Sequence, residues 1–204
     1  LALQKRIDQA LAWYGKSKYF IPEGKVILVT HSMGGLVTRR AAQLSPDKIL
    51  GVVHGVQPVA GAPVVYRRFR SGTEVAGMFD VSGAAAATII GWDAADITCV
   101  MANSPGPLEL LPSKHYPPDW LKIERKNGDE RELLFSLPKS DPYSEIYAKR
   151  AQEVWWGMVD EGLIDPAEMG KDKNKTPIQM YYEAIKTAEK FHDTLGLACH
   201  PTTC

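Results

Sequence analysis

The most constraining feature of the sequence is a short apolar run that ends in a serine. Residues 25–30, KVILVT, lead through His31 into Ser32, and two glycines follow one residue later. An almost wholly apolar run of this length is typical of a parallel strand that is covered on both faces. The segment after the glycines, LVTRRAAQL, predicts a helix that ends before Pro46. The serine therefore occupies an abrupt turn between a strand and a helix.

Two flanking segments extend this pattern into a βαβ unit. A second apolar run, ILGVVHGV at residues 49–56, follows the helix. Two strands joined by a helix in so short a stretch pair in parallel, with a right-handed crossover. An amphipathic helix over residues 2–17 precedes the unit, because apolar side chains recur there three and four positions apart. The predicted fold class is therefore α/β.

The residue on this turn has the chemistry of a nucleophile. A serine hydroxyl is a weak nucleophile until a base takes its proton and N–H groups hold the oxyanion, so it must project from a tight turn. Small residues are needed two positions before and after it, and here these are Thr30 and Gly34. The backbone N–H of Met33, at the start of the helix, is the candidate for half of the oxyanion hole. The alternative is a tight strand-to-helix connection without catalytic function.

The segment THSMGGLVTR resembles the nucleophile elbow of the α/β-hydrolase superfamily of lipases and esterases. The similarity is greatest to the branch of lecithin:cholesterol acyltransferase and the GPI-inositol deacylase-like proteins. GVQPVAGAP is similar to the loop that leads into the lid of that branch, and NSPGPLELLP to its segment that ends in Leu-Leu-Pro. Bacterial phospholipases with such a domain, including type VI secretion effectors, are the group that the chain resembles. The resemblance implies a partial α/β-hydrolase core over residues 1–62 and a large, mostly helical lid over residues 63–204.

By this resemblance Ser32 is the nucleophile of a serine hydrolase that cleaves lipid acyl esters through an acyl-enzyme, as lipases and phospholipases do. The family needs no metal or cofactor. An acyltransferase with the same serine is one alternative, and it differs only in what accepts the acyl group. The other is a non-catalytic piece of the fold that binds a partner protein, for instance an immunity protein. An effector would be secreted or act in the periplasm, and the sequence leaves the compartment open.

The acid and the base of the triad have weaker signals. In this superfamily they follow the serine in the order acid, then histidine. Some lipases place an aspartate after the second strand, where this chain has Gln57, an amide that cannot balance an imidazolium charge. Asp80 and Asp93 are the alternatives. His200 is the candidate base, since it follows every candidate acid in a loop after a helix, and a surface or capping role is its alternative. The other histidines are assigned elsewhere: His31 diverges from the serine, His54 lies in a strand, His115 in a loop and His192 on a helix.

The sequence also predicts that the chain is a piece of a longer protein. It opens on Leu1, without an initiating Met or a signal peptide pattern. No strands precede the helix before the elbow, although a hydrolase sheet places several there, and no further buried strand follows residue 56. We therefore expect a complementing segment or a second chain to complete the site.

The net charge limits the classes of partner that the chain can attract. The 24 basic and 24 acidic residues cancel, so no global field favours nucleic acid, and a lipid must be held by apolar contact. The most apolar window, residues 81–92, is well short of the roughly 20 residues of a membrane span. It predicts a lid or interfacial segment, as does Trp155-Trp156, with core packing as the alternative. An arginine cluster at residues 67–70 faces either a phosphate headgroup or solvent.

Further elements are predicted along the second part of the chain. They are helices at 63–70 and near 84–91, a β-hairpin from residue 120 to 137 with Asn127-Gly128 at its turn, a helix from Asp141 through residue 159, and a helix from Thr176 to Leu195 that Gly196 ends. Three cysteines, Cys99, Cys199 and Cys204, leave the redox compartment open. The terminal CHPTTC has too few ligands for a closed zinc site.

Overall fold

The computed structural model describes residues 2–17, 24–72, 93–170 and 174–196. The chain divides into two compact units, Leu1–Val59 with Leu195–Cys204, and Ala60–Thr194. The sequence predicted a division between residues 62 and 63, with residues from 195 onward in the second part. The predicted helix near 84–91, Asp80, His200, Cys199 and Cys204 lie outside the described residues.

The first unit is built around the βαβ motif that the sequence predicts. Its elements are α1 (Ala2–Tyr14), β1 (Val26–His31), α2 (Met33–Leu44), a 3-10 turn η1 (Pro46–Lys48) and β2 (Ile49–Gly55). β1 and β2 pair in parallel, with Val29 opposite Val53 and His31 opposite Gly55. The parallel pair and its connecting helix are therefore confirmed.

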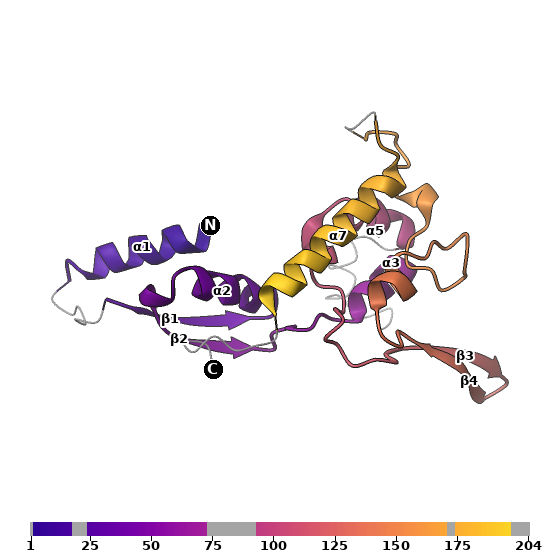
Figure 1. Ribbon diagram of the computed structural model, residues 1–204, viewed down its shortest axis with the longest axis horizontal. Coiled ribbons are helices and arrows are strands. Elements are labelled where there is room, and N and C mark those ends of the chain that lie inside the picture. The colour runs from indigo at the N-terminus through magenta and orange to yellow at the C-terminus, as the bar shows by residue number, and fades with distance from the viewer. Residues whose placement is uncertain (1, 18–23, 73–92, 171–173, 197–204) are drawn as a thin grey trace, which may run out of the picture. The chain divides into compact units, whose positions relative to one another are not determined.

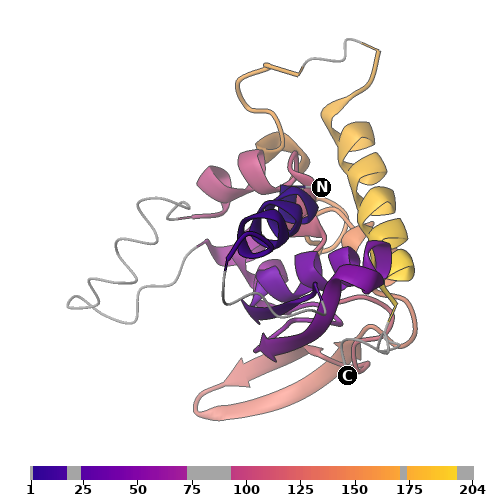
Figure 2. The ribbon, with the colours of Figure 1, turned by 90° about the vertical axis from the view of Figure 1, so that its left-hand side faces the viewer.

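The two helices of this unit lie on one side of the strand pair, as both views show (Figure 1, Figure 2). Ile7 of α1, Ala42 of α2 and Ile49 of β2 form the buried core between them. Side chains of the opposite strand face are exposed, with Val29 at 80% and Val53 at 57% of their full accessibility. The prediction that the strands are covered on both faces is therefore wrong for this unit taken by itself. Apolar residues on an open sheet face are unusual, because their burial drives folding.

The second unit contains helices and a hairpin around a separate core. Its elements are α3 (Val64–Ser71), α5 (Ala94–Met101), α6 (Pro105–Leu108), β3 (Leu121–Asn127), β4 (Glu130–Leu137), the π-turn η2 (Tyr143–Tyr147), the 3-10 turn η3 (Glu161–Leu163) and α7 (Pro177–Leu195). The core includes the fully buried Tyr147 and Tyr181. No helix in the described part of the chain is long and apolar enough to span a membrane.

The hairpin β3–β4 is confirmed, with its turn one residue later than predicted. Asn127 pairs with Glu130, so the two turn residues are Gly128 and Asp129. Gly128 has a φ of 63°, and glycine at the first turn position suits a two-residue hairpin loop. The strands lie side by side in both views (Figure 1, Figure 2).

The long helix predicted from Asp141 is wrong. The Asp141 carboxylate accepts the N–H of Tyr143 at 3.1 Å, as a helix cap would, but helical structure ends at Tyr147. The reason lies at Gly157, where an added Cβ would be 2.3 Å from the carbonyl of Arg150. Only glycine allows this approach of two backbone segments, and it folds the chain back on itself instead of continuing the helix. The predicted helix before Gly196 is present as α7.

Candidate active site

Ser32 stands on the abrupt turn that the sequence predicts. It lies between β1 and α2 with φ 51° and ψ −127°, a conformation that non-glycine residues rarely adopt. Its N–H donates to the carbonyl of Gly55 on β2 at 2.9 Å, and its own carbonyl accepts the N–H of Gly35 at 2.9 Å. The residue is half-buried. These two hydrogen bonds hold the backbone of Ser32 in this conformation, directly after the carboxyl end of β1.

The N–H of Met33 lies at the N-terminus of α2, directly after Ser32. Met33 is the first residue of α2, and the first N–H groups of a helix have no acceptor within it. The aligned peptides of the 12-residue helix add positive potential at this end. An oxyanion formed beside Ser32 would therefore meet both a donor and the positive end of a helix.

Gln57 covers the first turn of α2. A Cβ added to Gly35 would lie 2.6 Å from Cγ and 2.9 Å from Cβ of Gln57. Because Gly35 has no side chain, the Gln57 side chain can lie directly against the backbone of the helix. Gln57 is the residue that stands where some lipases carry the acid.

The serine hydroxyl has no hydrogen-bond partner, histidine or other, within the described residues. His54 is half-buried on β2, and its Nδ1 lies 3.0 Å from Oγ1 of Thr30. Burial, and then the positive charge of Arg39, lower the pKa of His54, so the ring is neutral at neutral pH. His31 and His115 are exposed. The candidate base His200 lies outside the described residues.

His192 has a structural setting that the sequence did not distinguish. It is buried in the second unit, with Nε2 at 2.8 Å from the carbonyl of Glu109 and Nδ1 at 2.6 Å from the hydroxyl of Tyr143. Because a carbonyl only accepts, Nε2 carries the proton and Nδ1 accepts from Tyr143. The ring therefore joins α7 to two other segments, and both of its nitrogens are used.

One arginine of the cluster on α3 forms a hydrogen bond within the protein. Nη2 of Arg70 donates to the carbonyl of Trp155 at 2.8 Å, and the hydroxyl of Tyr66 donates to the carbonyl of Trp156 at 2.6 Å. These bonds hold the Trp155-Trp156 segment against the helix. Trp155 is 62% exposed, in agreement with an apolar surface rather than a buried core at this residue.

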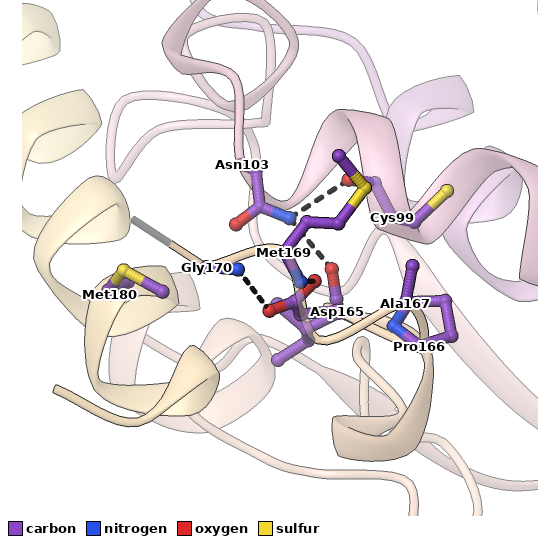
Figure 3. A pocket seen from close by; sticks show the side chains of 9 residues that line it. Cys99, Asn103, Asp165, Pro166, Ala167, Met169, Gly170 and Met180 are labelled. Atoms are coloured by element: carbon purple, nitrogen blue, oxygen red, sulfur yellow. Dashed lines mark hydrogen bonds between the residues drawn. The ribbon is translucent and has the colours of Figure 1, made fainter. Parts of the chain in front are cut away.

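The second unit also contains an open pocket of about 540 Å³ that no sequence pattern indicates. Figure 3 shows Cys99, Met169 and Met180 around it. The polar side chains at its wall form hydrogen bonds with backbone groups. Asn103 donates to the carbonyls of Cys99 and Ile164, and the Asp165 carboxylate accepts two backbone N–H groups. The pocket therefore presents mostly apolar surface.

The described residues contain no group of three metal-binding side chains. Cys99 is a free, half-buried thiol.

Of the comparisons with known proteins, the one with solved structures found a match. No family model and no curated protein matches the chain. Among solved structures, a chain in the crystal structure of the Tle4–Tli4 complex superposes with a TM-score of 0.73 and 33% sequence identity over 95% of this chain. This chain is similar to part of that one. It covers 38% of the matched chain's length. With the parallel strand pair, the match agrees with a partial α/β fold.

Proposed function

We propose that this chain carries the nucleophile segment of an α/β-hydrolase that cleaves lipid acyl esters, a lipase or phospholipase. The observation that carries the proposal is the backbone of Ser32, held at φ 51° and ψ −127° between a parallel strand and a helix. Such a conformation costs about 1–3 kcal/mol and persists where the surrounding structure enforces it, often at functional sites. The match to a chain of the Tle4–Tli4 complex supports the assignment, since it includes nearly the whole of this chain.

The proposed reaction uses the Ser32 hydroxyl as the nucleophile and the Met33 N–H as an oxyanion donor. A base takes the Ser32 hydroxyl proton while the oxygen attacks the ester carbonyl carbon, and the oxyanion is held by the Met33 N–H. The tetrahedral intermediate expels the alcohol, which receives the proton from the base. Water then hydrolyses the acyl-enzyme by the same steps and releases a fatty acid. An acyltransferase would replace that water with another alcohol.

The remaining parts of the site are proposed to lie on a complementing segment of the same protein. The chain spans 38% of the matched chain, which leaves more than half of that length for other strands, the acid and the second oxyanion donor. The exposed apolar face of β1 and β2, with Val29 80% exposed, supports the same conclusion, because such a face is normally covered. The base is His200 or a histidine of that segment.

An effector context with a protein partner is the finer part of the proposal. The matched chain belongs to a complex of two named components, Tle4 and Tli4. By analogy we propose a type VI secretion lipase effector that is neutralised by an immunity protein and acts outside the cytoplasm that produces it. A non-catalytic piece that only binds such a partner is the competing function, and it predicts no turnover.

The proposal is tested by ester hydrolysis in the intact polypeptide. Phospholipid vesicles and p-nitrophenyl acyl esters are the substrates, and released fatty acid is measured. Ser32→Ala should lower kcat by at least about 1000-fold, because a site that loses its nucleophile loses several orders of magnitude. Ser71→Ala, an exposed serine on α3, is the matched control and should keep the rate. Full activity of Ser32→Ala, or no turnover by the wild type, would contradict the proposal.

A further inference from the structure

Two neighbouring strands end in strained residues at the same edge of the sheet. His31 and Gly55 are register partners, and the residues that follow them are Ser32, with φ 51°, and Val56, with φ 46°. Positive φ is uncommon for any side chain and a clear outlier for a β-branched one. Backbone strain of this kind persists only where surrounding contacts enforce it. The serine turn therefore depends on contacts that hold the ends of β1 and β2 together.

One such contact joins two side chains just before the strained residues. Thr30 lies two residues before Ser32, and His54 lies two residues before Val56. Thr30 and His54 are directly opposite each other in the parallel register, and Oγ1 of Thr30 lies 3.0 Å from Nδ1 of His54. A side-chain hydrogen bond therefore joins the two strands at the point where both are about to turn.

The Thr30 hydroxyl has a second partner on β2. Its Oγ1 lies 3.3 Å from the carbonyl oxygen of Val53. Both contacts are satisfied together when the hydroxyl donates to this carbonyl, which can only accept, and the His54 ring donates from Nδ1 to Oγ1. Glycine, the usual residue at this position of an elbow, has no side chain that could form either bond. The threonine therefore gives this elbow two cross-strand bonds that a glycine could not provide.

The backbone of Ser32 depends on the alignment that these bonds maintain. The N–H of Ser32 donates to the carbonyl of Gly55, the residue directly after His54, at 2.9 Å. A shift between the ends of the two strands would lengthen this bond and release the strained φ of the serine. The side chains of Thr30 and His54 are half-buried, so their bond is stronger than it would be in open water. The bond can therefore oppose such a shift.

We propose that Thr30 is a positioning residue of the site: its hydrogen bonds to His54 and Val53 keep the ends of β1 and β2 aligned and thereby hold the Ser32 hydroxyl in its reactive direction. The inference rests on the proposed function. Thr30 acts through the backbone of the serine and does not touch the reacting atoms. Its loss should therefore slow the chemical step and the reactions of the serine itself, with little effect on substrate binding.

Three variants of the intact polypeptide separate this role from simple packing. Thr30→Val keeps the branched shape without the hydroxyl, Thr30→Ser keeps the hydroxyl, and His54→Leu removes the ring nitrogen. We expect Thr30→Val to lower kcat by about 10- to 100-fold with little change in KM, since misplacing a catalytic group costs rate. The rate at which a fluorophosphonate labels Ser32 should fall in parallel. Thr30→Ser should recover most of both rates.

A double-mutant cycle tests whether the two side chains act together. His54→Leu should lower kcat as Thr30→Val does, and the double variant should be about as slow as the slower single variant, because each substitution removes the same bond. Losses that multiply in the double variant would contradict a shared role. If Thr30→Val does not fold, His54→Leu tests the same bond from its other side.

The matched control is Thr187→Val on α7, whose hydroxyl donates to the carbonyl of Glu183 at 2.9 Å. It loses one hydrogen bond in the second unit and should keep kcat. Thermal melts establish which variants fold. Wild-type kcat in folded Thr30→Val, or a loss that Thr30→Ser does not reverse, overturns the positioning role while the hydrolase assignment stands. A wild type that hydrolyses no ester overturns both.

Discussion

The backbone N–H of Ser32 donates to the carbonyl of Gly55 at 2.9 Å, across the two parallel strands of the first unit. Gly55 is the last residue of β2, which the chain reaches only after α2 has crossed over the strand pair. The serine turn is therefore fixed by a contact that needs the whole βαβ unit. A parallel pair, a crossover helix and a glycine for close packing together produce one strained residue.

Gly35→Ala should destabilise the first unit by about 1–3 kcal/mol, as overpacked sites do. The new Cβ would lie 2.6 Å from Cγ and 2.9 Å from Cβ of Gln57, so the side chain covering the elbow must move. Gly34→Ala is the matched control, since no atom lies within 4 Å of a Cβ there. Urea unfolding of the intact polypeptide measures both. Equal stabilities of the two variants would show that Gln57 moves aside without cost.

Val29 should be inaccessible in the intact polypeptide, although it is 80% exposed in the chain described here. The proposed complementing segment is expected to cover this strand face. In a background with the three native cysteines replaced by serine, Val29→Cys should resist a maleimide reagent, whereas Lys5→Cys on the exposed side of α1 should react. Rapid modification of Val29→Cys would mean that the strand face stays open.

Stability should depend on pH through His192. Burial lowers its pKa below the ordinary 6.5, so below that pH the unfolded chain binds a proton that the folded protein does not. The free energy of unfolding should therefore fall as the pH drops from about 7 to 5, by up to about 1.4 kcal/mol per pH unit from this group.

His192→Gln removes that contribution, and its unfolding free energy should depend less steeply on pH over the same range. The nearby charges of Asp193, Glu189 and His115 are present in both proteins, so the difference in slope isolates the imidazole. Denaturant unfolding at several pH values measures it. Parallel curves for the two proteins would refute a neutral buried ring.

Gly157→Ala should cost about 3 kcal/mol or more, at the upper end for overpacking. Its Cβ would lie 2.3 Å from both backbone carbon and oxygen of Arg150, and a backbone contact cannot turn aside as a side chain can. Gly106→Ala on α6 has open space and should be nearly neutral. Thermal melts that show the same loss for both would contradict the close approach.

The first unit was predictable because its signals are local. The apolar run before Ser32, the helix after it and the second run at residues 49–56 each specify an element, and the right-handed crossover rule joins them. The exposure of Val29 could not be predicted from the apolar residues of β1. A strand that is buried on both faces has this composition whether the segment that covers it belongs to this chain or to another.

The second unit was harder to predict because tertiary contacts override its local pattern. Asp141 and Pro142 form a helix start, and a helix does begin there, but the approach of Gly157 to Arg150 ends it after Tyr147. That approach joins residues seven apart through backbone packing, which no periodicity records. A glycine within a helical pattern was the available signal.

The site was predictable only in its nucleophile turn. Thr30 and Gly34 stand at the two positions where an elbow pattern has small residues, although a Cβ added at Gly34 would have no atom within 4 Å. Ser32 has the strained backbone expected of such a turn. The sequence shows Gln57 only as an amide at the position where some lipases carry the acid. Its packing on Gly35 could not be predicted, because that contact depends on how β2 ends. The catalytic roles of Ser32, Met33 and His200 remain predictions.

The most direct test of the account is covalent labelling of the intact polypeptide with a fluorophosphonate, followed by peptide mass spectrometry. We expect one adduct per chain on the peptide that contains Ser32, and none in Ser32→Ala. Labelling at another serine, or an unmodified Ser32 in a folded protein that contains all its segments, would contradict the claim that this turn presents a nucleophile.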